Sequence, residues 1–135
     1  MKNAYQKYKA TSIQSASREK LLLMMYEGAI KFVKLALAAM EKKDIAGRGE
    51  NIGRAFDIVL ELNNTLDHKV GDGELAKQLE QLYMFITDQF TKANINNDAK
   101  PLREALKILE TLYEGWKQAV EQIKKSEEKT ILKAK

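Results

Sequence analysis

Cysteine is absent from this 135-residue chain, histidine and proline occur once each, and no apolar run approaches the length of a membrane span. Without cysteine there is no disulfide framework, thiolate metal site or thiol nucleophile. The single histidine, His68, stands in a polar stretch and cannot supply the histidine pair of a zinc site or the Glu-x-x-His repeat of a di-iron bundle. We therefore expect no metal, no cofactor and no membrane insertion.

Catalytic motifs are equally scarce. The glycines at 47, 49 and 53 follow a predicted helix and have the wrong spacing for a dinucleotide-binding loop. No serine has a nearby histidine to activate it, and no carboxylate pair falls on a predicted apolar face. The acidic residues between 67 and 74 lack the alternating oxygen ligands of a calcium loop. The sequence thus predicts a protein that is not an enzyme.

The net charge of +4 comes from 23 Lys and Arg against 19 Asp and Glu. Lysines are interleaved with glutamates, and no dense arginine patch with interleaved aromatics is present, which argues against nucleic-acid binding. The opening stretch MKNAYQKYKATS lacks the apolar centre of a secretory signal. We therefore expect the protein in the cytoplasm (cytosol).

The regular spacing of apolar residues and the lack of proline predict an all-α protein with four long helices. The expected ranges are 17–42, 44–66, 75–94 and 98–125. Ser17, Asp44 and either Asn97 or Asp98 are suitable helix caps. Short connections favour antiparallel neighbours, so we expect an up-down four-helix bundle. The expected parts of the chain are an N-terminal capping segment (1–16), the bundle (17–125) and a charged, flexible tail (126–135).

The first predicted helix carries more apolar surface than packing on a single core requires. Its apolar side chains cover an arc of about 260°, whereas a helix lying on a core needs about 100°. The arc has a centre (Leu22, Met25, Ala29, Val33, Ala36, Met40), one flank (Leu21, Met24, Gly28, Phe32, Leu35), a second flank (Leu23, Tyr26, Ile30, Leu37) and a polar remainder (Lys20, Glu27, Lys31, Lys34). Two neighbouring helices explain most of such an arc, whereas an open flank would form a groove for an incoming apolar helix.

The segment AYQKYKATSIQSASREKLLLMMYEGAIKFVKLA resembles the N-terminal signature of the flagellar export chaperone FliS family. That signature is an aromatic lead, a T-[SA]-[VI]-Q-x-A-S element, and then E-K-L-L-x-M-[LM]-Y-[DE]-G-A. The similarity continues through ENIGRAFDIVLELNNTLD and LYMFITDQFTKANINND, so it covers the whole predicted bundle. The chain departs from the pattern at Arg18, where the family commonly has proline, and at Glu27, where it often has aspartate.

The resemblance implies a cytoplasmic chaperone that binds the C-terminal helical segment of flagellin, prevents premature polymerisation and holds flagellin for the flagellar type III export apparatus. It also implies an N-terminal segment that acts as a movable cap. Carried onto this chain, the partner-binding residues are Tyr8 and Ile13 in the cap, Leu21, Met24, Met25, Gly28 and Phe32 on one groove wall, and Ile58 and Leu62 on the facing wall.

Several alternatives stay open from the residues themselves. The apolar flank would equally suit the interface of a structural or dimerising helical module, including a weak homodimer. Gly28 permits close approach of a partner backbone or, equally, close packing against another helix of the same chain. The segment before Ser17 either caps the open flank or packs against the end of the bundle.

Overall fold

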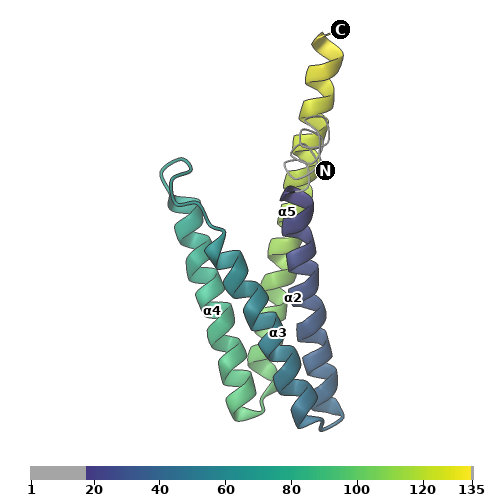
Figure 1. The fold of residues 1–135 in the computed structure, drawn as a ribbon, viewed down its shortest axis with the longest axis vertical. Helices are drawn as coiled ribbons and strands as arrows, with labels where there is room; N and C mark the ends of the chain where they lie inside the picture. The colour runs from purple at the N-terminus through teal and green to yellow at the C-terminus, as the bar shows by residue number, and fades with distance from the viewer. Residues whose placement is uncertain (1–17, 135) are drawn as a thin grey trace, which may run out of the picture.

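The computed structural model describes residues 18–134, which form four α-helices joined by short turns. These helices are α2 (Arg18–Glu41), α3 (Ile45–Asn64), α4 (Glu74–Asn96) and α5 (Ala99–Ala134). Each helix packs against its neighbours in the chain, and α5 closes the ring by packing against α2. Successive helices run in opposite directions (Figure 1), so the predicted all-α, up-down four-helix bundle is confirmed.

Two of the predicted caps form as expected. The Asp44 carboxylate accepts a hydrogen bond from the Gly47 backbone N–H at 2.9 Å, which satisfies an orphan donor at the start of α3. At the start of α5, the Asp98 carboxylate accepts from the Lys100 N–H at 3.0 Å. The remaining predicted cap, Ser17, lies outside the described residues.

The core is a line of buried apolar side chains contributed by all four helices. The largest that are completely buried are Tyr26, Val33, Val59, Leu62, Ile86, Phe90, Leu102 and Leu109. Full burial of one such aliphatic or aromatic side chain stabilises the fold by about 1.5–3 kcal/mol. The packed interior, not helix propensity, therefore holds the bundle together.

The C-terminal helix is longer than the sequence pattern predicts. The residues after 125 were expected to form a charged, flexible tail, but α5 continues as helix to Ala134 and projects beyond the rest of the bundle (Figure 1). Every residue from 121 to 133 is exposed. No proline or glycine follows Gly115 to end the helix, and the intervening lysines and glutamates are good helix formers.

The two halves of the bundle diverge at one end. Toward the turn that joins α3 to α4, these two helices lean away from α2 and α5 (Figure 1). Side chains from all four helices and the turn line a cleft of about 250 Å³ there: Leu22, Leu62, Thr65, Leu66, Asp67, Val70, Leu75, Ala76, Leu79, Tyr83 and Trp116. Its lining is mainly apolar.

Candidate functional site

The outer face of α2 carries an uncovered apolar strip, which we call the α2 strip and define as Leu21, Met24 and Leu35. These side chains are 57%, 54% and 43% exposed. All three belong to the flank of the first helix that the sequence predicts as part of a groove wall. They lie on α2 to one side of its buried face, and their exposure shows that no helix among residues 18–134 covers them fully.

Two contacts establish how α2 and α3 lie side by side next to this strip. A Cβ added at Gly28 would meet the Ile58 Cδ1 atom at 3.2 Å. Four residues further along α2, the Phe32 ring lies beneath the Arg54 guanidinium, whose central carbon is 5.6 Å from the ring centroid. The close approach that Gly28 allows in this structure is therefore to a helix of the same chain.

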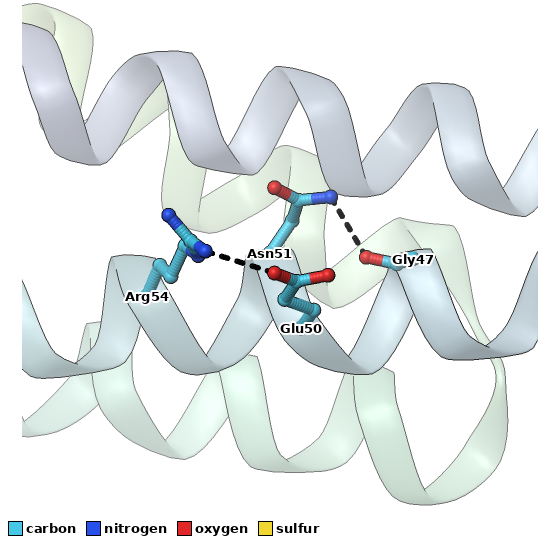
Figure 2. Close-up of polar contacts among 4 residues, drawn as sticks. All are labelled: Gly47, Glu50, Asn51 and Arg54. Carbon is cyan, nitrogen blue, oxygen red and sulfur yellow. Dashed lines mark hydrogen bonds and ion pairs between the residues drawn. The ribbon is translucent and has the colours of Figure 1, made fainter.

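The Phe32 ring is flanked by a second cation and is only partly buried. The Lys31 ammonium lies 5.8 Å from the centroid of the same ring, in a range where cations are attracted to aromatic faces. On α3, the Glu50 carboxylate accepts a hydrogen bond from Arg54 at 2.9 Å (Figure 2). This pair holds the guanidinium near Phe32 and balances its charge.

Figure 2 also shows how α3 presents polar groups toward α2. The Asn51 side-chain amide donates a hydrogen bond to the Gly47 carbonyl at 2.8 Å, one turn back along the same helix. Because this bond is internal to α3, Asn51 needs no partner on another helix. Arg48, in the same part of α3, instead donates hydrogen bonds to the side chain and the carbonyl of Asn94 on α4, both at 3.3 Å.

The other edge of the strip faces α5. The Tyr113 phenol donates a hydrogen bond to the Glu27 carboxylate, and the Lys34 ammonium lies 3.9 Å from a Glu110 carboxylate oxygen. The hydrogen bond to Glu27 raises the pKa of Tyr113 because it is made by the protonated phenol. A shallow, mainly apolar depression lies between α2 and α5 at this edge, and its lining includes Leu35 and Lys31.

The remaining predicted site residues are less accessible or lie elsewhere. Met25 and Ile58 are partly buried and pack against the core. Leu62 is only 1% exposed, so in this structure it is a core residue at the base of the end cleft and not a surface wall. Tyr8 and Ile13, predicted for the cap, lie outside the described residues.

Sequence reasoning missed the end cleft and the polar cluster beneath it. The Tyr26 hydroxyl accepts a hydrogen bond from the Trp116 indole N–H at 3.1 Å and shares another with the Tyr83 hydroxyl. Burial raises the pKa of Tyr26 and of Tyr83, so both phenols stay protonated. The helical period places Tyr26 on a flank of α2, whereas this contact with α4 and α5 buries it completely.

The surfaces described above combine exposed apolar side chains with ordinary surface charges. Among residues 18–134 there is no group of three or more His, Cys, Asp or Glu side chains that could hold a metal ion. Over the same range, no helix has the length and hydropathy needed to cross a bilayer. Exposed methionine and leucine beside a partly buried aromatic ring form an adaptable apolar surface that suits the apolar face of another helix.

Comparisons with known proteins connect this bundle to flagellar secretion. The model of the family described as "Flagellar protein FliS" matches residues 1–123. The chain is 36% identical over 122 residues to the flagellar secretion chaperone FliS of Vibrio cholerae, with 87% of this chain and 89% of the relative covered. It is 33% identical over 125 residues to the FliS of Bacillus subtilis, with 93% and 92% covered. The corresponding Salmonella typhimurium protein is 32% identical over 109 residues, 80% of each chain.

Proposed function

Because this chain belongs to the FliS family of flagellar secretion chaperones, we propose that its client is the C-terminal helical segment of flagellin. The chaperone binds this segment as an amphipathic helix along the α2 strip. Flagellin bound in this way cannot polymerise prematurely in the cytoplasm and is held ready for the flagellar type III export apparatus. The resemblance of the N-terminal signature to the same family supports the proposal.

The single observation that carries the proposal is the exposure of Leu21, Met24 and Leu35 on one face of α2. Large apolar side chains that gather on one face of a monomer mark a site where another molecule docks. A client helix with apolar residues at positions i, i+3, i+4 and i+7 would remove them from water. Phe32, under its two cations, and Ile58, against Gly28, form the adjoining surface on the α3 side.

The proposed mechanism is equilibrium binding without nucleotide hydrolysis. A chaperone that binds only the monomeric client lowers the concentration of free client and so opposes assembly by mass action. The N-terminal segment, with Tyr8 and Ile13, is proposed to cap part of the same surface until the client replaces it. Release then follows from competition and needs no covalent chemistry.

A pair of methionine substitutions tests this function. Met24→Glu introduces a carboxylate into the α2 strip, whereas Met84→Glu makes the same change on α4, where the side chain is equally exposed at 58%. Affinity for a flagellin C-terminal peptide is measured by isothermal titration calorimetry. We expect Met24→Glu to weaken binding at least about tenfold, equivalent to about 1.4 kcal/mol, because the charge must be desolvated against the client's apolar face.

The Met84→Glu variant is the control for the loss of binding expected of Met24→Glu. Met84→Glu is expected to bind within about twofold of the unaltered chain, since its side chain lies away from the strip. Thermal unfolding followed by circular dichroism establishes that both variants are folded. If the unaltered chain fails to bind the peptide, the proposed client is wrong; if the two variants lose affinity equally, the proposed location is wrong.

A further inference from the structure

The edge of the α2 strip that faces α5 carries basic charge. Lys20, Glu27, Lys31 and Lys34 follow one another along α2 at helical spacing and form the polar line beside the strip. The contacts of Glu27 and Lys34 with α5 show which side this line faces. Within residues 18–134, Lys20 and Lys31 have no carboxylate partner, although the Lys31 ammonium also lies near the Phe32 ring. This edge therefore presents two positive charges that no carboxylate in the described part of the chain balances.

The opposite edge, on α3, carries negative charge. The contacts of Arg54 with Phe32 and of Ile58 with Gly28 show that this line of α3 lies against α2. Glu61 follows Ile58 by one turn on the same line, which brings it level with the first turns of α2. It is exposed and has no salt-bridge partner among the described residues, whereas Glu50 already balances the charge of Arg54.

We propose that these two edges determine the direction in which a client helix lies on the α2 strip. The client's acidic flank faces Lys20 and Lys31, and its basic flank faces Glu61. If the client helix is turned end for end while its apolar face stays on the strip, its acidic flank moves to the α3 edge and its basic flank to the α5 edge. Only one of the two directions therefore pairs opposite charges. The inference rests on the proposed function, because it concerns the same strip and the same class of client.

The expected size of the effect follows from the exposure of these charges. Individual exposed ion pairs contribute little, but three pairs made in one direction and three like-charge contacts in the other give a preference of about tenfold for one direction. The preference weakens as salt is raised, because exposed charges are screened. Affinity itself depends mainly on the apolar face.

Two designed peptides of about 20 residues, each about 30 Å long as a helix, test the proposal. They share the same composition and the same leucine and methionine face. In the first peptide, each glutamate stands one residue after an apolar position, and each lysine stands one residue before an apolar position. The glutamates and the lysines therefore lie on opposite flanks of the apolar face. In the second, the two flanks are exchanged. Because helix residues advance by about 100° each, we expect the first to bind parallel to α2 and the second antiparallel.

Spin labels report the direction. The chain contains no cysteine, so Asn64→Cys and Lys42→Cys, made separately in the full-length protein, each provide one labelling site near an opposite end of α2. A second label is placed at the peptide N-terminus, and the distance is measured by pulsed electron paramagnetic resonance. The first peptide should give the shorter distance to position 64, and the second to position 42.

A charge-reversed chaperone provides the decisive comparison. In the triple variant Lys20→Glu, Lys31→Glu, Glu61→Lys, each peptide should bind in the opposite direction with little change in affinity. The proposal is overturned if both peptides lie in the same direction, if each lies in both directions equally, or if neither binds to a chaperone that binds the flagellin segment. Failure of the flagellin segment itself to bind would instead overturn the proposed function.

Discussion

Tyr26 is the residue at which three helices meet. Its hydroxyl contacts Trp116 of α5 and Tyr83 of α4, although α2 and α4 lie diagonally across the bundle. A buried hydroxyl with two partners supports the packing around it, whereas a buried polar group left without a partner is costly. The cluster therefore stabilises the bundle just beneath the end cleft.

Two tyrosine substitutions distinguish the centre of this cluster from its edge. Tyr26→Phe leaves both the Tyr83 hydroxyl and the Trp116 indole N–H without their partner, and we expect it to lower the free energy of unfolding by about 2–3 kcal/mol. Tyr83→Phe leaves the bond from Trp116 to Tyr26 intact, and we expect a loss of about 1 kcal/mol. Urea unfolding measures both values, and equal losses would contradict the central role of Tyr26.

Glycines within the helices differ in what surrounds them. At Gly28 an added methyl group would press against Ile58, whereas at Gly53 it would meet nothing within 4 Å. Both residues are in helices, where alanine is favoured over glycine by about 1 kcal/mol. Of these two positions, Gly53 is the one at which that gain carries no steric cost.

The glycine comparison makes a second stability prediction. We expect Gly53→Ala to raise the free energy of unfolding by about 0.5–1 kcal/mol, and Gly28→Ala to give no gain because Ile58 must shift. In the Ile58→Val background, whose own cost is measured separately, Gly28→Ala should recover part of the gain, since valine lacks the Cδ1 atom that makes the contact. Chemical denaturation tests this series, and stabilisation by Gly28→Ala alone would show that the contact relaxes at no cost.

At the scale of the element, α5 has two parts with different roles. Its first half buries Leu102, Ala105 and Leu109 in the core, and Trp116 contacts Tyr26. Its second half is exposed at every residue from 121 to 133. Because tertiary packing supplies most helical stability in proteins, the second half should contribute little to the stability of the bundle.

Truncation after Lys125 tests this division of α5. We expect the free energy of unfolding to change by less than about 0.5 kcal/mol, because the residues removed are exposed. The far-ultraviolet circular dichroism signal should decrease because helical residues are lost. A loss of several kcal/mol would show instead that the projecting half of α5 packs against another part of the chain.

At the scale of the whole molecule, the α2 strip is small for a self-association surface. It presents three large apolar side chains, whereas a stable protein–protein interface takes about 20–30 residues from each partner. We therefore expect the chain without a client to be a monomer, and a module that dimerises through α2 stays the alternative to be tested.

Sedimentation equilibrium distinguishes these two states. We expect the mass of one 15.4 kDa chain over micromolar to hundreds-of-micromolar concentrations. The Met24→Glu variant serves as the control, because it should sediment as the unaltered chain does. A dimer that dissociates when Met24 is replaced would identify the strip as a homomeric interface, which is the alternative that the sequence leaves open.

Local sequence signals were sufficient to predict the four helices among residues 18–134, two of their caps and the exposure of Leu21 and Met24. Periodicity and capping act within a few residues, so they can be read along the chain. The length of α5 was underestimated because its last turns lack an apolar pattern, although nothing in them breaks a helix. The predicted roles of Tyr8 and Ile13 stay predictions, since both lie outside the described residues.

The packing of the helices against one another determines which of the remaining side chains are buried, exposed or paired. It buries Tyr26 and Leu62, uses Gly28 to admit Ile58, and pairs Glu27 with Tyr113. The partners of Tyr26 lie 57 and 90 residues away in the chain, and Tyr113 lies 86 residues from Glu27. The period of one helix defines which residues share a face, but neighbouring helices determine which part of that face stays exposed.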